Sequence, residues 1–340
     1  MPSASTFQAG LLRPPMISVL ASRCVPSTAP RPARTLATSA GSRTIVVIFT
    51  RFLDFHVQGN APTNGRIIVQ IAVGYELTYD LPQPTPMLLT VNIHYSRASD
   101  LVEPDHLVTT PSVPITGYRD LFGNWISRIV APTGRTRLSS HAVVNDAGNA
   151  DPIFPSAIQH TVQDLPEETL VFLLGSRYCE TDHLSEIAWS LFSASPLGWA
   201  RVQAICDFVH NHLEFGYEHA RPTKTAWEAY RERTGVCRDF AHLAITLCRC
   251  LNIPARYCTG YLGDIGVPAM DAPMDFSGWF EAYLGGQWHV FDARFNTPRI
   301  GRVLMARGRD AADVAIVTTF GPNTLTGFQV SAEEIVAMTR

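Results

Sequence analysis

The segment from Gly235 to Leu251 constrains the fold of this chain most, because a glycine and a valine lead into a cysteine and then into a helical apolar pattern. Apolar residues recur there every three or four positions, the spacing of one helix face. They are Cys237, Phe240, Ala241, Ala244, Ile245 and Cys248. Leucines at positions 243, 247 and 251 widen that face. The pattern predicts a helix that begins at Cys237 and is buried on most sides.

The cysteine at the start of this helix is a candidate nucleophile. A helix N-terminus presents unpaired N–H groups and about half a positive charge, and both favour a thiolate over a thiol. The alternative is that Cys237 is a small buried apolar residue, as most free cysteines are. The entry through Gly235, together with a hairpin further along the chain, favours the reactive interpretation.

His242 follows Cys237 by five residues in the same predicted helix. Five residues correspond to about 140° of rotation around the helix axis, so the imidazole is badly placed to accept the proton of that thiol. We interpret His242 as a structural partner of Asp239, three residues earlier.

A β-hairpin is predicted from two alternating apolar runs, Trp279–Tyr283 and Trp288–Asp292. Gly285 and Gly286 lie between the runs, and two glycines are a strong signal for a two-residue hairpin turn. That turn would pair Trp279 with Asp292.

The same register would pair Ser277 with Arg294, and Ala282 with His289. Ser277, Trp279 and Asp292 then share one face of the hairpin. Position 277 is a diagonal neighbour of Asp292, about 7–8 Å away between backbones, a gap that an imidazole could cross and a serine hydroxyl could not. His289 falls on the opposite face and cannot substitute.

Four stretches of the sequence resemble the bacterial transglutaminase-like cysteine proteases. They are Gly235–Leu243, Asn252–Tyr257, Gly260-Tyr261 and the tryptophan hairpin that ends in Phe291-Asp292. The turn Phe122-Gly123-Asn124 is similar to one in the β domain that often precedes this domain. The resemblance covers most of residues 70–325. It implies an α+β fold, with a papain/transglutaminase-like core in which the cysteine helix packs on an antiparallel sheet, preceded by an all-β domain.

The resemblance also implies roles for particular residues. Cys237 would be the nucleophile, and Asp292 would orient the histidine that accepts the thiol proton. The family has that histidine 15 residues before the aspartate, and here the position is Ser277. A serine hydroxyl cannot accept a proton as imidazole does, so general base catalysis worth roughly 10²–10⁴-fold is missing unless another group supplies it.

The sequence leaves two ways to compensate for the missing base. His219 lies in a stretch of loop character before the cysteine and could fold over it as a substitute base. Alternatively, the helix N-terminus alone keeps Cys237 ionised, which would suit activated esters or thioesters better than peptides.

Two functions therefore remain. The first is a thiol hydrolase or acyltransferase, a cysteine peptidase or amidase, that acts on a peptide or protein through a Cys237 thioester. The second is a catalytically silent relative whose cleft binds a peptide or partner protein.

The 340 residues, 46% of them hydrophobic, suffice for two folded domains. Residues 1–66 are rich in serine, alanine, proline and arginine and predict a disordered extension, although their composition also resembles an organellar transit peptide. Strand-like alternation, as in Tyr75–Tyr79 and Trp125–Val130, predicts a β-rich domain over 67–160. Helical spacing within 184–213 opens a second domain, the transglutaminase-like one, over 161–330.

The composition limits the classes of partner and the cellular compartment that we expect for this chain. The net charge is −3, and the arginines of the first 66 residues leave the remainder more acidic, which argues against a nucleic-acid partner. The longest early apolar run, Ile45–Phe49, is too short to span a bilayer. Seven scattered cysteines favour a reducing cytoplasm over a disulfide framework. No cofactor or metal site is expected, because Cys206 and His210 lack a second pair of ligands.

Overall fold

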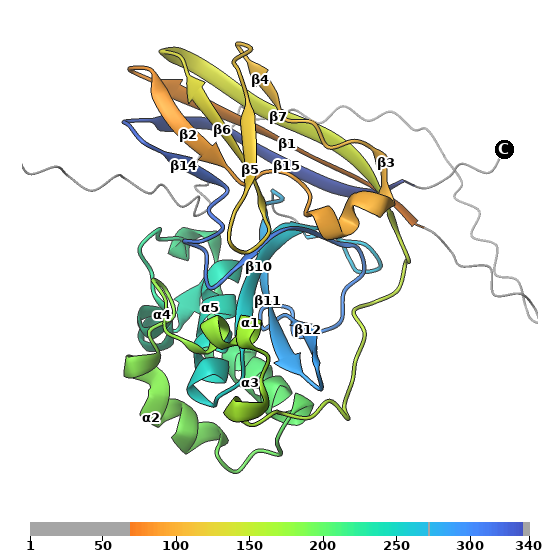
Figure 1. Cartoon of the computed structure of the whole chain (residues 1–340), viewed down its shortest axis with the longest axis vertical. Coiled ribbons are helices and arrows are strands. Elements are labelled where there is room, and N and C mark those ends of the chain that lie inside the picture. Colours follow the sequence, from red (N-terminus) through yellow and green to blue (C-terminus); the bar gives the residue numbers. More distant parts are fainter. Residues whose placement is uncertain (1–68, 271–272, 336–340) are drawn as a thin grey trace, which may run out of the picture.

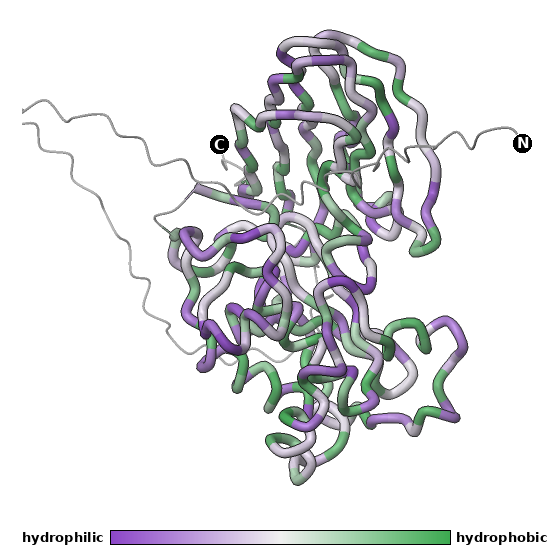
Figure 2. The backbone as a smooth tube through the Cα atoms, turned by 90° about the vertical axis from the view of Figure 1, so that its left-hand side faces the viewer, coloured by the Kyte–Doolittle hydropathy of each residue, from purple (hydrophilic) through white to green (hydrophobic). Residues whose placement is uncertain are grey.

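The computed structural model describes residues 69–270 and 273–335. The predicted extension at residues 1–66 lies outside this part of the chain. Two lobes are visible, a β-rich lobe and a lobe that carries the helices (Figure 1). In the side view of Figure 2, apolar and polar residues alternate along the strands of the β-rich lobe, as expected for strands with one buried face.

The β-rich lobe consists of two antiparallel sheets. One sheet has the order β15-β1-β7-β3, with β4 also paired to β7, and the other has the order β14-β2-β6-β5. The bounds of the first sheet are β15 (Thr324–Ile335), β1 (Val69–Leu81), β7 (Gly134–Asp146), β3 (Leu101–Glu103) and β4 (Val108–Thr110). Those of the second are β14 (Val317–Thr319), β2 (Thr85–Leu89), β6 (Trp125–Ala131) and β5 (Thr116–Arg119).

The last two strands of the chain belong to these sheets. β15 pairs along β1, and β14 pairs with β2. The β-rich lobe is therefore built from both ends of the described chain, which differs from the sequence division that placed residues up to 330 in the second domain. The reason is long-range pairing: β1 between β15 and β7 buries Ile71, Val73 and Leu77 in the core of the lobe.

The second lobe packs helices on an antiparallel sheet of order β12-β11-β10-β13. Its strands are β10 (Ala255–Leu262), β11 (Ser277–Leu284), β12 (Gln287–Phe291) and β13 (Arg302–Gly308). Its helices are α1 (Glu167–Leu170), α2 (Thr181–Phe192), α3 (Trp199–His212), α4 (Ala226–Glu232) and α5 (Cys237–Cys250). A two-stranded parallel pair, β8 (Glu214–Phe215) with β9 (Thr234–Gly235), precedes α5.

The predicted cysteine helix is confirmed as α5, and it packs against β10 and β11. Gly235 is required just before it, because a Cβ there would lie 2.7 Å from the Cβ of Asp239. The Asp239 carboxylate accepts the Val236 N–H at 3.0 Å and so caps the first turn.

The predicted hairpin is confirmed, and its register holds from Phe280–Phe291 to the turn, whereas the described ladder does not extend to the predicted pairs of Trp279 with Asp292 and of Ser277 with Arg294. Phe280 pairs with Phe291 and Ala282 with His289. Gly285 and Gly286 have φ of 57° and 86°, the left-handed values that a type I′ turn needs and that glycine adopts without strain.

The sheet of the second lobe is covered on both faces. Phe280, Ala282 and Phe291 pack with α5 on one face, whereas Tyr261, Val303 and Met305 join the core of the β-rich lobe on the other. Burial on both faces fixes the strands that carry the candidate site.

The turn before β6 also joins the two lobes. The amide of Asn124 donates to the Arg307 carbonyl at 2.7 Å and accepts the Arg307 N–H at 2.8 Å. Asn124 is fully buried and is further held by Asp120.

Candidate active site

Cys237 is the first residue of α5 and faces the start of β11. Its Sγ lies 3.9 Å from the Phe276 carbonyl oxygen, to which the thiol donates, and the Gly278 N–H also contacts the sulfur. The side chain is partly exposed, so the sulfur is enclosed by protein on most sides but open toward a cavity.

This enclosure controls the ionisation of the thiol. Burial raises the pKa of Cys237 to about 11, and the carboxylate of Asp275 adds to the rise. The guanidinium of Arg294 and the Gly278 N–H act in the opposite direction but do not offset the loss of solvation. The pKa therefore lies above the ordinary value, whereas the helix N-terminus alone predicts a lower one.

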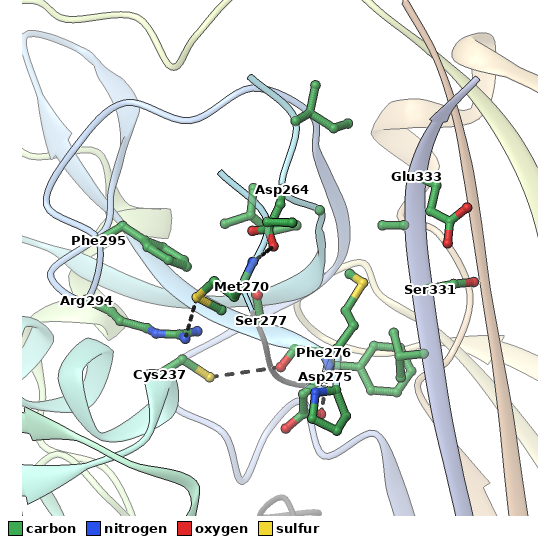
Figure 3. A pocket seen from close by; sticks show the side chains of 18 of the residues that line it. Cys237, Asp264, Met270, Asp275, Phe276, Ser277, Arg294, Phe295, Ser331 and Glu333 are labelled. Carbon is green, nitrogen blue, oxygen red and sulfur yellow. Dashed lines mark hydrogen bonds between the residues drawn. The ribbon is translucent and has the colours of Figure 1, made fainter. Parts of the chain in front are cut away.

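A cavity of about 430 Å³ opens beside the thiol, between the two lobes. Its walls come from the end of β10, the residues before β11, the segment after β12 and the end of β15 (Figure 3). Among the described residues that form these walls there is no histidine. The described wall of the cavity thus mixes apolar and polar residues and contains the thiol, but it lacks an imidazole base.

Ser277 is in the cavity wall together with Cys237. It is the first residue of β11, where it pairs with Gly260, and only 8% of it is exposed. Its backbone carbonyl accepts the Thr259 hydroxyl at 3.1 Å, while its own hydroxyl has no hydrogen-bond partner among the described residues. Figure 3 shows Ser277 at the cavity.

Asp292 is buried behind the site and its oxygens are occupied. Oδ1 accepts the backbone N–H groups of Arg294 and Phe295 at 3.0 and 3.1 Å, and Oδ2 accepts from Arg302 at 2.9 Å. Arg302 also bonds Asp151 at 2.8 Å. Asp292 is not among the described residues of the cavity wall. Its carboxylate instead caps the turn after β12 and forms an ion pair with Arg302.

His219 is not among the described residues of the cavity wall. His219 ends the short 3-10 helix η4 (Tyr217–His219), and its Nε2 lies 3.7 Å from the Glu218 carboxylate. Tyr217 reaches the cavity wall, but in the part of the chain that the structure describes no hydrogen bond or ion pair joins His219 to Cys237.

The predicted pairing of His242 with Asp239 is wrong. His242 Nε2 accepts the Ala311 N–H at 3.1 Å, and the ring stacks on Tyr178 with centroids 5.1 Å apart. Asp239 instead binds Arg238 at 3.0 Å and the Val236 N–H. Burial lowers the pKa of His242 well below its ordinary value, which keeps the ring neutral. His242 therefore has a structural role, as predicted, but its partner is the Ala311 backbone and not Asp239.

Two arginines of the site were missed as functional residues. The predicted hairpin register placed Arg294 opposite Ser277, which was a usable signal for its place in the cavity wall. Nothing in the local sequence pattern connected Arg302 to Asp292.

In residues 69–270 and 273–335, no group of three histidine, cysteine or acidic side chains is arranged to hold a metal ion. No described helix is long and apolar enough to span a bilayer.

Comparison with known proteins assigns the family. Residues 191–293 match the model of the transglutaminase-like superfamily. A solved structure described as a “putative cysteine protease” from Cytophaga hutchinsonii is 31% identical, with a TM-score of 0.67, over 80% of this chain and 93% of that one. The chain therefore belongs to the transglutaminase-like superfamily, and its mixed α and β fold is similar to that of this solved structure.

Two further matches are partial. An uncharacterized protein of Mycobacterium leprae is 33% identical over 94 residues, which are 26% of this chain and 32% of that protein. This chain thus spans about a third of that relative. The periplasmic domain of TgpA from Pseudomonas aeruginosa, bound to ethylmercury, is 14% identical over 66% of this chain and 90% of that one, with a TM-score of 0.34.

Proposed function

We propose that this chain binds a peptide or protein segment in the cavity beside Cys237 without cleaving it, as a catalytically silent member of its superfamily. One observation carries the proposal: the described wall of the cavity contains the thiol and Ser277 but no histidine. A binding cleft needs shape and polar groups, which the cavity offers, whereas amide cleavage needs a proton acceptor as well.

The protonation state of the thiol supports this proposal. With a pKa of about 11, roughly one Cys237 in 10⁴ is a thiolate at pH 7. The nucleophile of thiol chemistry is the thiolate, and a base beside it is what usually generates this form. Ser277 cannot act in that way at neutral pH.

The position of Asp292 supports it further. Asp292 Oδ1 accepts two backbone N–H groups, and Oδ2 accepts from Arg302. A carboxylate oxygen accepts about two hydrogen bonds, so an imidazole introduced at position 277 would have to share Oδ2 with the Arg302 guanidinium.

A second candidate is a hydrolase or acyltransferase that forms a Cys237 thioester. The observation in its favour is that the thiol is partly exposed in the cavity and lies near the Arg294 guanidinium. An activated ester or thioester could reach the sulfur there, with His219 as the proposed substitute base if η4 moves.

Turnover assays on matched variants separate the two candidates. The wild type, Cys237→Ala, Ser277→His and His219→Ala are each incubated with a fluorogenic peptide amide library and with a peptide thioester. The binding proposal expects the wild type and Cys237→Ala to be equally inactive on amides. Thioester turnover that disappears in both Cys237→Ala and His219→Ala would establish the second candidate instead.

Binding is measured separately with the same peptide library, labelled with fluorescein, by fluorescence anisotropy. Members retained by the wild type should also bind Cys237→Ala, because the thiol is not needed for shape or charge. The variant Ser277→Trp places a bulky side chain in the cavity and should abolish this binding. The binding proposal fails if no library member binds, or if Ser277→Trp leaves the binding unchanged.

A further inference from the structure

Arg294 is held rigidly at the edge of the cavity. Its backbone N–H donates to Asp292 at 3.0 Å. Its guanidinium carbon lies 3.7 Å from the ring centroid of Phe215 and 4.5 Å from that of Phe295. Stacking between aromatic faces leaves the N–H edges of a guanidinium available to a ligand. Figure 3 shows this side chain directed toward the same part of the cavity as Cys237.

The positive charge of Arg294 has no carboxylate partner within residues 69–270 and 273–335. The one polar contact of its guanidinium there is the Met270 sulfur, 3.9 Å away. A thioether is a weak acceptor, so most of the five N–H donors remain available.

None of the four acidic residues in the described cavity wall forms an ion pair with Arg294, although the charge of Asp275 reaches the Cys237 thiol. Asp264 bonds Arg299 at 3.3 Å and the Met270 N–H, and Asp275 accepts the Phe276 N–H. Glu333 and Glu334 lie at the exposed end of β15, and Figure 3 shows Glu333 across the cavity from Arg294.

A second polar group points to a ligand at the same place. The hydroxyl of Ser277 belongs to a residue more than nine-tenths buried, lies in the cavity wall, and has no described hydrogen-bond partner. Because this hydroxyl lies in the cavity wall, a bound ligand can accept its hydrogen bond there.

We propose that Arg294 and Ser277 together bind a carboxylate of the peptide ligand beside the Cys237 thiol. The guanidinium fork matches the two oxygens of a carboxylate, and the serine hydroxyl donates to one of them. The carboxylate is either the free C-terminus or an acidic side chain of the peptide. This inference rests on the proposed function, because it concerns the ligand of the same cavity.

Two alkylating agents test the proposal without knowledge of the ligand. Iodoacetate and iodoacetamide both react with the Cys237 thiolate and release iodide, but only iodoacetate carries a carboxylate. The ratio of their rate constants at Cys237 cancels the thiolate fraction, so it measures carboxylate attraction and not the pKa of the thiol. Peptide mass spectrometry separates Cys237 from the other cysteines.

The Arg294→Gln variant should lower the ratio of iodoacetate to iodoacetamide rates about fivefold, the size of a partly exposed charge pair. Ser277→Ala should lower it less. Arg128→Gln removes the same charge from an exposed position on β6 and should leave the ratio unchanged. If Arg294→Gln does not fold, Arg294→Lys keeps the charge without the fork and should give an intermediate ratio. An equal ratio in the wild type and both Arg294 variants would overturn the proposal.

Peptide pairs then identify the source of the carboxylate. Library members that bind are remade with a C-terminal amide, and separately with glutamine in place of glutamate. Loss of affinity in one series identifies the C-terminus or the side chain. If peptides bind but neither change matters, the carboxylate proposal fails while the proposed function stands. If no peptide binds but the alkylation ratio changes in the Arg294 variants, the proposed function fails while the carboxylate proposal stands.

Discussion

The buried carboxylate of Asp292 is held by the guanidinium of Arg302, with Oδ2 and Nη2 2.9 Å apart. Arg302 also binds Asp151, a residue of the segment that connects the two lobes, at 2.8 Å. The acid that the superfamily pattern assigns to catalysis is therefore part of a structural ion network in this chain.

Removing the arginine of this network should destabilise the fold strongly. Arg302→Leu leaves the buried carboxylate of Asp292 and the half-buried one of Asp151 without their shared counter-charge, and breaking a buried pair typically costs about 3–5 kcal/mol. Urea unfolding monitored by tryptophan fluorescence measures the free energy of unfolding. The matched control is Arg137→Gln, whose ion pair with Glu76 is about half exposed and should contribute little. Equal losses in the two variants would contradict a structural role for the network.

Stability should fall as the pH drops below neutrality because of buried neutral histidines. Burial lowers the pKa of His242 well below 6.5 and that of His94 to about 4. Above pH 6.5 both states of the protein hold these rings neutral. Below pH 6.5 these rings are protonated in the unfolded chain but stay neutral in the folded chain. Each ring therefore lowers the free energy of unfolding by up to about 1.4 kcal/mol per pH unit.

The variant His242→Gln should therefore flatten the dependence of unfolding free energy on pH between 6.5 and 5. Urea midpoints at several pH values measure it. His183→Gln, at an exposed position on α2, is the control and should keep the wild-type slope. An unchanged slope in His242→Gln would mean that the ring titrates normally in the folded protein.

The hydrogen bonds of Asn124 between the two lobes should contribute more to the free energy of unfolding than those of an amide side chain on the surface. Asn124→Ala leaves the N–H and the carbonyl of Arg307 without their partner, at a cost of about 1–3 kcal/mol for each buried group. Thermal unfolding should show a lower midpoint for this variant, while Asn149→Ala, at an exposed position, should match the wild type. The same midpoint in both variants would show that the lobes do not depend on this turn.

Local sequence patterns predicted the parts of the site that local chemistry determines. Gly285-Gly286 fixed the hairpin register, and the apolar spacing after Gly235 placed Cys237 at the start of a helix. Both follow from backbone preferences over fewer than twenty residues.

The rest depends on contacts between distant segments. The pairing of β15 with β1, the bond from Ala311 to His242, and the ion pair of Arg302 with Asp292 each join residues that no local period connects. The raised pKa of Cys237 has the same origin, because the strand β11 and the residues before it enclose a helix terminus that would otherwise favour the thiolate.

The most direct test of the account is the pH dependence of Cys237 alkylation by iodoacetamide, followed at the Cys237 peptide by mass spectrometry. We expect a rate that rises about tenfold per pH unit from pH 7 to 10, toward a pKa of about 11, because only the thiolate reacts. Ser277→His should raise the rate at pH 7, and Ser277→Ala should not. A wild-type rate that already reaches a plateau below pH 8 would show an activated thiolate and contradict the silent site.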